Sequence, residues 1–257
     1  MCLLVVVFGL DPGAPLVIGA NRDERLDRPA TAMTVLREGG PRVLGGRDEQ
    51  AGGTWLAVNE HGVVAGLTNR PSPDGRDPSK RSRGELPLAL AGHADAAAAV
   101  DDVAARLRPA DYNPAWLLVG DRTTLYALDM TGDGQVEVEE LGAGIHILEN
   151  NPLHTRSAKV DHVRALLGDA ADRRGDDLLE VVRSVLADHS VPGTVTPAEA
   201  GRAVETLAAC VHTESYGTRS STLVAVPAET GRAPRLRVAD GHPCTAPFVD
   251  AAGLWRP

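Results

Sequence analysis

The sequence predicts an α+β fold, a four-layered αββα sandwich in which two antiparallel sheets pack face to face and helices cover their outer faces. Apolar runs of strand length occur in groups joined by short turns, which is typical of antiparallel hairpins. Helical segments separate these groups, and sheets of this kind need an apolar partner on each buried face. Residues 1–257 contain no internal repeat and no shift in composition, so one domain is expected, although periodicity alone does not fix the stacking order.

Paired strands dominate the first part of the chain. The apolar run that begins at Cys2 ends at the turn Asp11-Pro12-Gly13, and a second turn, Asn59-Glu60-His61-Gly62, also lies between two apolar runs. Each turn predicts an antiparallel hairpin. The expected strands cover residues 2–10, 16–21, 54–58 and 63–68.

A polar segment, residues 71–83, follows the second hairpin. It is rich in Pro, Ser, Asp, Arg and Lys and has no apolar periodicity, which predicts a surface loop or a lid that gates a site. After it, Val100, Val103 and Leu107 recur at helical spacing, and Gly120-Asp121 marks another strand turn. The helices expected in the rest of the chain cover residues 85–91, 95–107, 155–167, 176–187 and 197–207, and the strands cover residues 115–119, 124–128, 135–141, 146–149, 221–226 and 236–239.

Composition excludes several classes of function. A net charge of -9 argues against a nucleic-acid partner, which would need clustered positive charge. The apolar run at the N-terminus is nine residues long and lacks a basic flank, so it fits neither a signal peptide nor a membrane span. Three scattered cysteines do not make a disulfide framework, and a reducing, cytoplasmic location is expected.

Metal and cofactor sites are not indicated by local spacing. The eight histidines show no HExxH or other paired pattern, and no CxxC is present. Cys210 and Cys244 are interpreted as inert thiols, and His212 is the one histidine of interest because it precedes Arg219 by a few residues. No glycine-rich dinucleotide or phosphate loop opens a helix, so no metal and no cofactor are expected.

Cys2 is the residue best placed for chemistry. Removal of Met1 would leave a thiol and a free α-amine on the same residue, with pKa values near ~8.5 and ~8. The amine can then take the thiol proton without a distant histidine, and the thiolate can attack a carbonyl carbon. This mechanism fails if Met1 is retained. The alternative interpretation is that Cys2 is a small apolar residue at the start of a buried strand.

The segment Gly-Ala-Asn-Arg-Asp-Glu at residues 19–24, close behind a Met-Cys start, resembles the NRDE family, also called the transport and Golgi organisation protein 2 family. Through it the chain is similar to N-terminal nucleophile hydrolases such as penicillin V acylase and conjugated bile acid hydrolase, whose mature chains begin with cysteine. The resemblance therefore implies their four-layered fold. Other matching segments, in family order, are residues 53–57, 66–71, 148–152 and 216–222.

This resemblance implies roles for individual residues. Asp23 would orient the nucleophile and its α-amine. Asn69 and Asn150 would support the oxyanion, as side-chain amides aimed at developing negative charge do. Arg219 would favour the thiolate or bind a carboxylate. The expected catalytic set is Cys2, Asp23, Asn150, Arg219 and Asn69.

The place of a family arginine, three residues before the aspartate, is taken by Ala20, and Arg22 is expected to supply the cation instead. The residues expected to bind substrate are Arg22, Asn21, Trp55 and Arg70. Other interpretations remain open for these segments: a polar strand exit with a surface ion pair for residues 21–24, a turn for residues 150–152, and a core position for Trp55.

Two functions follow from the resemblance. In the first, the protein is an amidohydrolase that uses Cys2 to cleave a carbon-nitrogen amide bond in a small acylated substrate. In the second, it is a non-catalytic carrier of a lipid, acyl-CoA or haem on the same fold. An apolar pocket would favour the carrier, whereas polar groups converging on the Cys2 sulfur would favour the enzyme.

Overall fold

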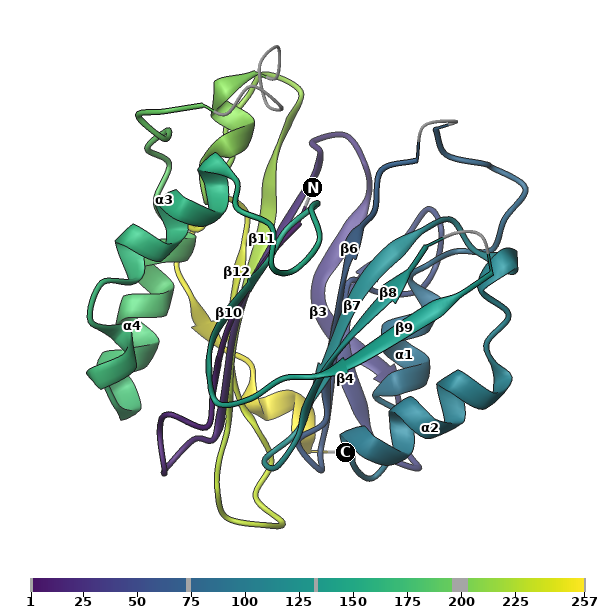
Figure 1. Cartoon of the computed structure of the whole chain (residues 1–257). Helices are drawn as coiled ribbons and strands as arrows, with labels where there is room; N and C mark the ends of the chain where they lie inside the picture. The colour runs from purple at the N-terminus through teal and green to yellow at the C-terminus, as the bar shows by residue number, and fades with distance from the viewer. Residues whose placement is uncertain (1, 73–74, 132–133, 196–202, 257) are drawn as a thin grey trace.

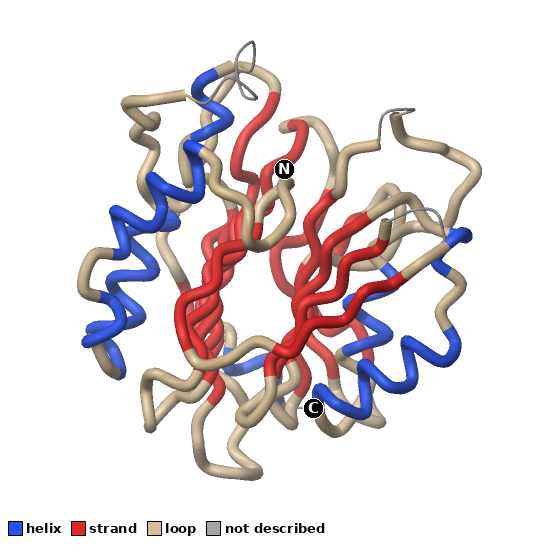
Figure 2. Tube along the Cα trace, viewed as in Figure 1, coloured by secondary structure: helices blue, strands red, loops and turns tan. Residues whose placement is uncertain are grey.

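The computed structural model describes residues 2–72, 75–131, 134–195 and 203–256. Within these residues the strands form two antiparallel sheets that stack face to face, with α3 and α4 outside one sheet and α1 and α2 outside the other (Figure 1). The expected α+β sandwich of four layers, αββα, is confirmed. Figure 2 shows the layering as two stacks of strands between pairs of helices.

The first sheet has the order β10-β1-β2-β11-β12-β13 and the second the order β3-β4-β5-β6-β7-β8-β9. All pairings within both sheets are antiparallel. The strands of the first sheet are β1 (Cys2–Phe8), β2 (Leu16–Arg25), β10 (Gly144–Leu148), β11 (Tyr216–Val226), β12 (Arg235–Asp240) and β13 (Val249–Asp250). Those of the second are β3 (Ala30–Arg37), β4 (Val43–Asp48), β5 (Leu56–Asn59), β6 (Val64–Asn69), β7 (Ala115–Gly120), β8 (Leu125–Met130) and β9 (Val136–Glu140).

Side-chain caps fix where two of the four α-helices in the described residues begin. Asp95 and Ser157 accept hydrogen bonds from the backbone amides of Ala98 and Val160, which satisfies donors that a helix start leaves open. The helices are α1 (Glu85–Leu90), α2 (Ala96–Arg106), α3 (Ala158–Leu167) and α4 (Gly175–Leu186), and the 3-10 turns are η1 (Pro109–Asp111), η2 (Ala170–Asp172), η4 (Val204–Leu207) and η5 (Ala252–Trp255). None of the described helices combines the length and apolarity needed to span a membrane.

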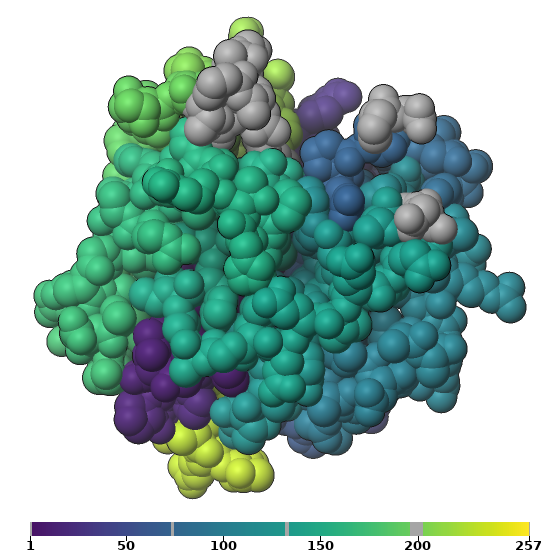
Figure 3. Space-filling view, in the orientation of Figure 1, coloured from purple at the N-terminus to yellow at the C-terminus, as the bar shows by residue number. Residues whose placement is uncertain are grey.

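Strand β1 shows how the layers are built. Its side chains alternate between faces, so Leu4 and Val6 join the core between the sheets while Leu3 and Val5 join the core beneath α3 and α4. A third apolar cluster fills the space beneath α1 and α2. In the space-filling view, side chains fill the interval that separates the ribbons of the two sheets (Figure 3). By the same alternation Cys2 shares the inter-sheet face with Leu4.

Three strands were missing from the prediction: β3, β4 and the two-residue strand β13. β3 and β4 precede the first expected strand of the second sheet. β3 is an edge strand with mostly half-buried residues, so its alternation is weak. β4 contains Gly45 and Gly46, which lower strand propensity. Both glycines are required by close packing, since an added Cβ would lie 2.3 Å from the Leu56 carbonyl oxygen at the first and 2.0 Å from the Trp55 ring at the second.

The prediction was also wrong at two other places. Strand β2 does not end at Asn21 but continues to Arg25, and strand β11 begins at Tyr216 rather than Ser221. Polar residues extend both strands because their side chains are buried between elements. The helix expected over residues 197–207 lies partly outside the described residues, and its described end is the 3-10 turn η4.

Candidate active site

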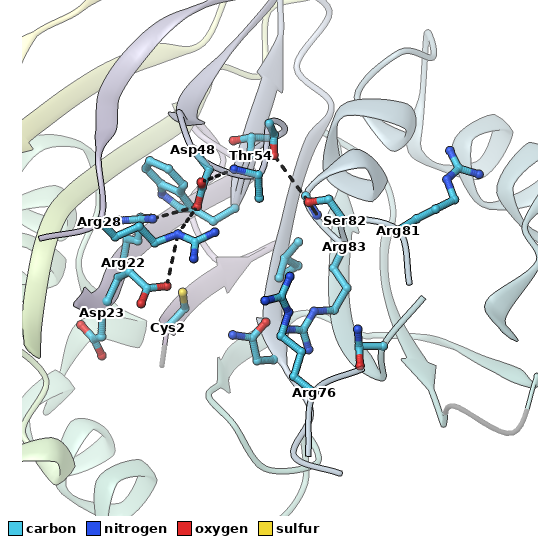
Figure 4. Close-up of a pocket in the computed structure, with 18 residues that line it drawn as sticks. Cys2, Arg22, Asp23, Arg28, Asp48, Thr54, Arg76, Arg81, Ser82 and Arg83 are labelled. Atoms are coloured by element: carbon cyan, nitrogen blue, oxygen red, sulfur yellow. Dashed lines mark hydrogen bonds and ion pairs between the residues drawn. The ribbon is translucent and has the colours of Figure 1, made fainter. Parts of the chain in front are cut away.

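Cys2 lines a cavity of about 280 Å³, where the ends of strands from both sheets meet Arg76 and residues 81–83. It is half-buried and pairs across the sheet with Arg22. In Figure 4 its sulfur points toward the space that has Arg22 on one side and Arg76 and Arg83 on the other. The cavity is lined by Cys2, Arg22, Asp23, Glu24, Arg28, Asp48, Ala51, Gly52, Thr54, Trp55, Leu67, Asn69, Arg76, Arg81, Ser82, Arg83, Gly84 and Asn113.

Several neighbours act on the Cys2 thiol. Burial raises the pKa of Cys2, and the nearby Asp23 carboxylate raises it further. The Arg22 guanidinium and a hydrogen bond from the backbone amide of Asp23 act in the opposite direction, but the pKa remains above its usual value. The thiol is therefore the favoured form at neutral pH, and a base is needed to activate it.

Asp23 is fixed by contacts from two other elements, β11 and α3. Its carboxylate accepts a hydrogen bond of 2.6 Å from the Thr218 hydroxyl on β11 and lies 3.4 Å from the Nζ of Lys159 on α3. Both side chains of this ion pair are fully buried. The Tyr216 hydroxyl donates to the Asp23 backbone carbonyl at 2.7 Å. These contacts hold the carboxylate at one orientation beside the start of β1.

Arg22 brings a cation to the same edge. Its guanidinium lies 4.5 Å from the centre of the Trp55 ring, within the range of a cation-π contact, and its Nη2 forms an ion pair of 3.1 Å with Asp48. The Nη1 atom is buried without a hydrogen-bond partner among the described residues. Ala20, on the same face two residues earlier, is buried in the core between the sheets. Arg22, and not Ala20, therefore places a positive charge on this face opposite Cys2.

Five arginines line the cavity among the described residues, against three carboxylates. Asp48 is shared by Arg22 and by Arg28, whose Nε lies 2.7 Å from it. Within the part of the chain that the structure describes, Arg76 and Arg83 form no ion pair, and both face the cavity in Figure 4. Burial, together with repulsion from Arg76, lowers the pKa of Arg83. An anion between these two guanidinium groups would relieve that repulsion.

The two predicted oxyanion residues are adjacent. Asn69 lines the cavity at the end of β6, and the Asn150 side-chain amide donates a hydrogen bond to the Asn69 backbone carbonyl. The Asn150 Oδ1 atom is buried without a hydrogen-bond partner among the described residues. Asn69, Arg70 and Asn150 line a neighbouring cavity, where Arg70 pairs with Asp129 and lies 5.4 Å from the Trp116 ring centre.

Two other predicted residues lie away from the cavity. The Asn21 amide faces the helical layer, where it donates hydrogen bonds of 2.9 and 2.8 Å to the backbone carbonyls of Leu186 and Ala209. Arg219 lies at a register shift in β11 and donates to the backbone carbonyls of Leu26 and Arg28. From these positions both residues brace the chain around the site.

Sequence reasoning missed several residues of this site. Lys159 occupies a buried position of α3, and nothing in its local spacing distinguishes it from a surface lysine. Asp48 lies on a strand that was not expected. Arg76 and Arg83 belong to the segment 71–83, whose expected position over a site is consistent with its contribution to the cavity lining.

Comparison with known proteins identifies the family to which the chain belongs. Residues 1–233 match the model of the family described as Transport and Golgi organisation 2. A Transport and Golgi organization protein 2 homolog from Bos taurus is 29% identical over 256 residues, which cover 89% of this chain and 90% of that protein.

Solved structures show the same fold at low sequence identity. A cysteine-to-alanine mutant of conjugated bile acid hydrolase from Clostridium perfringens has a TM-score of 0.51 at 12% identity and covers 97% of this chain and 96% of its own. The Caenorhabditis elegans ortholog of N-acylethanolamine-hydrolyzing acid amidase has a TM-score of 0.53 at 13% identity and covers 89% of this chain and 94% of its own. The fold is therefore that of the N-terminal nucleophile hydrolases.

Proposed function

Because the chain belongs to the Transport and Golgi organisation 2 family and has the fold of N-terminal nucleophile hydrolases, we propose that it is an amidohydrolase. It cleaves the carbon-nitrogen amide bond of a small acylated substrate, with Cys2 as the nucleophile. The observation that supports this most is the convergence of polar groups on one sulfur. Cys2 lines a cavity together with Asp23, Arg22 and Asn69.

Activation requires removal of Met1. The α-amine of Cys2 then takes the thiol proton, and Asp23, held by Thr218 and Lys159, orients the resulting ammonium group. The thiolate attacks the amide carbon, and the carbonyl oxygen gains negative charge. The side-chain amide of Asn69 and the free Nη1 of Arg22, which both line the cavity, are the donors proposed to stabilise it, and Asn150 supports Asn69 by donating to its backbone carbonyl.

Collapse of this intermediate breaks the carbon-nitrogen bond. The ammonium group returns its proton to the leaving nitrogen, which departs as an amine and leaves a thioester on Cys2. The freed α-amine then deprotonates a water molecule, which attacks the thioester and releases the carboxylic acid and the thiol. The reaction needs a free thiol, and the described cysteines are free, so we place it in the reducing cytoplasm.

The charge of the cavity indicates the class of substrate. Arg76 and Arg83 face the cavity without an ion-pair partner among the described residues, so an anionic group, a carboxylate or a phosphate, would be bound there. A cavity of about 280 Å³ holds a small molecule. The proposed substrate is a small N-acyl compound that carries one anionic group near the scissile amide.

The second hypothesis, a non-catalytic carrier of a lipid, acyl-CoA or haem, has less support. A carrier of an apolar ligand would bind it in a pocket with mostly apolar walls. Charged side chains dominate the lining here. The carrier also gives no reason for a buried carboxylate beside Cys2 that is held by residues of both β11 and α3.

A panel of N-acyl amino acids, with amides lacking the carboxylate as matched controls, tests the proposal. The protein, with its N-terminus verified by mass, should release acid and amine from carboxylated members, and Cys2→Ala should abolish release while still binding them. Cys2→Ser should retain a low rate. Binding without turnover by the processed wild-type chain, unchanged in Cys2→Ala, would instead support the carrier.

A further inference from the structure

A second cluster of reactive side chains lies outside the cavity. The ligand atoms of Cys210, His212 and His242 all lie within 4.8 Å of one another. The sulfur of Cys244 lies 3.9 Å from that of Cys210 and 3.1 Å from Nε2 of His212. Two sequence fragments supply the four groups, Cys210-Val211-His212 before β11 and His242-Pro243-Cys244 after β12. Their separation in sequence explains why local spacing did not reveal the cluster.

The separation of the two cysteine sulfurs fits a tetrahedral zinc ion, whereas the 3.1 Å between the Cys244 sulfur and His212 Nε2 is shorter than zinc coordination gives, so Cys244 would shift when it joins the ligands Cys210, His212 and His242. With Zn–S bonds of about 2.3 Å and Zn–N bonds of about 2.0–2.1 Å, two coordinated sulfurs lie about 3.8 Å apart and a sulfur and a nitrogen about 3.6 Å apart. The separation between the Cys210 and Cys244 sulfurs matches the first value within about 0.1 Å. It is too long for a disulfide, and both cysteines are free.

The chemical state of the donors also suits a cation. The His242 Nδ1 atom is buried and has no hydrogen-bond partner among the described residues. The rings of His212 and His242 stack with centroids 3.9 Å apart, an arrangement that disfavours two positive charges.

The packing around the cluster leaves no room for a larger residue beneath it. At Gly217 an added Cβ would lie 2.7 Å from the Val211 carbonyl oxygen and 2.9 Å from Cε1 of His242. Glycine at this position thus lets the imidazole of His242 lie against β11, next to the fragment that carries Cys210 and His212.

We propose that Cys210, His212, His242 and Cys244 form a structural zinc site of the Cys₂His₂ type. Zinc binding would replace two thiol protons, leaving two thiolates and two neutral imidazoles around the ion. Four protein ligands leave no position for substrate, so the role is to join the two fragments.

The site would also act on the position of Asp23. The backbone amide of Val211 donates to the Thr218 hydroxyl at 2.8 Å, and that hydroxyl donates to Asp23 at 2.6 Å. The Thr218 amide donates to the Val211 carbonyl at 2.9 Å. Val211 lies between the ligands Cys210 and His212, so zinc would fix its position. Val211 in turn holds Thr218, whose hydroxyl donates the hydrogen bond that fixes Asp23.

The full chain, purified under reducing conditions without chelator, should contain one zinc per chain by elemental mass spectrometry. Replacement by Co²⁺ should give the visible bands of a tetrahedral site and the near-ultraviolet bands of cobalt thiolates. The variants His212→Ala and Cys244→Ser change an exposed and a half-buried residue, so both are expected to fold, which circular dichroism checks. Each should weaken zinc binding at least on the order of 100-fold, since loss of even a supporting residue costs 10–100-fold.

Two controls separate this site from other thiols and histidines. His61→Ala, a change at another exposed histidine, and Cys2→Ala, a change at the proposed nucleophile, should leave zinc affinity and the cobalt spectrum unchanged. The proposal is overturned if the reduced chain binds no zinc, or if binding survives both ligand variants. Isolation from cells with Cys210 and Cys244 joined in a disulfide and no metal would also overturn it.

Discussion

At the scale of single residues, the reactivity of Cys2 depends on neighbours that act in opposite directions. Burial and Asp23 raise its pKa, and Arg22 lowers it. Reactivity toward an alkylating agent should therefore increase with pH through this raised pKa, because only the thiolate reacts. If these neighbours had no effect on the thiol, substitution of Asp23 or Arg22 would leave the alkylation rate of Cys2 unchanged.

Substitution of the two neighbours gives opposite predictions. Arg22→Gln should slow alkylation of Cys2 at neutral pH, and Asp23→Asn should accelerate it, each on the order of tenfold, because one nearby charge changes the thiolate fraction by about that factor. Asp23→Asn should nevertheless lose amide hydrolysis, since it removes the group that orients the α-ammonium. Rates that change in the same direction in both variants would contradict this account of the site.

The fully buried pair of Asp23 and Lys159 predicts an effect on stability. Lys159→Met removes the buried lysine partner of this carboxylate and should lower the free energy of unfolding by about 3–5 kcal/mol in urea denaturation. The double variant Asp23→Asn with Lys159→Met should recover most of this loss, because no unpaired charge remains. If the double variant is as unstable as the single one, the lysine acts through packing alone.

Single residues also show where sequence reasoning is limited. Cys2, Asp23 and Asn69 were predicted as catalytic residues, and all three line the same cavity beside the start of β1. Lys159 could not have been found in this way, because its burial depends on the docking of α3 against a strand more than a hundred positions earlier. Asn21 and Arg219 belong to matching segments, but alternation along β2 and the register shift in β11 direct their side chains elsewhere.

At the scale of elements, β2 and β4 connect the two sheets at the cavity. Arg22 lies on β2 and Arg28 lies just after its end. Both arginines pair with Asp48, the last residue of β4. Burial alone would raise the pKa of Asp48, but its hydrogen bonds with Arg28 and the Ala51 amide, together with the nearby positive charges, lower it overall. The charged carboxylate therefore stabilises the fold above the pKa of an unfolded aspartate, and this contribution is lost as pH falls through the lowered value.

Asp48→Asn should accordingly lower the free energy of unfolding on the order of 1 kcal/mol at neutral pH. The difference from wild type should be smaller at about pH 3, because this contribution is lost as pH falls below about 3.9, the pKa of an unfolded aspartate, toward the lowered pKa of Asp48. Urea denaturation at both pH values measures it. A difference that stays constant between them would show that the carboxylate charge does not link the sheets.

Elements with clear apolar alternation could be predicted, and those without it could not. β1, β5, β6 and β7 are apolar and nearly fully buried, and their expected positions are confirmed to within a few residues. β4 was missed because two glycines interrupt its pattern, although both serve the packing of residues 55–56. The glycines of β4 are required by contacts with other segments, so the sequence of β4 alone does not identify it as a strand.

At the scale of the whole molecule, charge is distributed unevenly. The chain has a net charge of -9, yet its cavity has more arginines than carboxylates among the described residues. Such a cleft attracts a small anion that the rest of the surface repels, and the attraction weakens with salt.

Arg83→Gln should therefore raise KM for a carboxylated substrate on the order of tenfold, with a smaller effect on its uncharged analogue. Arg156→Gln, the same change at an exposed arginine outside the cavity, should leave both values unchanged. Steady-state kinetics at low and high salt measure this. Equal effects of Arg83→Gln on the charged and uncharged substrates would contradict an anion site.

The layered architecture was predictable because strand groups and helices alternate along the chain. The order of strands was not, since β10 lies beside β1 and β11 beside β2 through contacts between distant segments. The cluster of Cys210, His212, His242 and Cys244 depends on the same long-range pairing.

Intact-protein mass spectrometry before and after cysteine alkylation tests whether Cys2 is an activated N-terminal nucleophile. Activation of Cys2 predicts loss of Met1 and modification of Cys2 in preference to Cys210 and Cys244, located by peptide mapping. A chain that retains Met1, with Cys2 no more reactive than the other two cysteines, would contradict it.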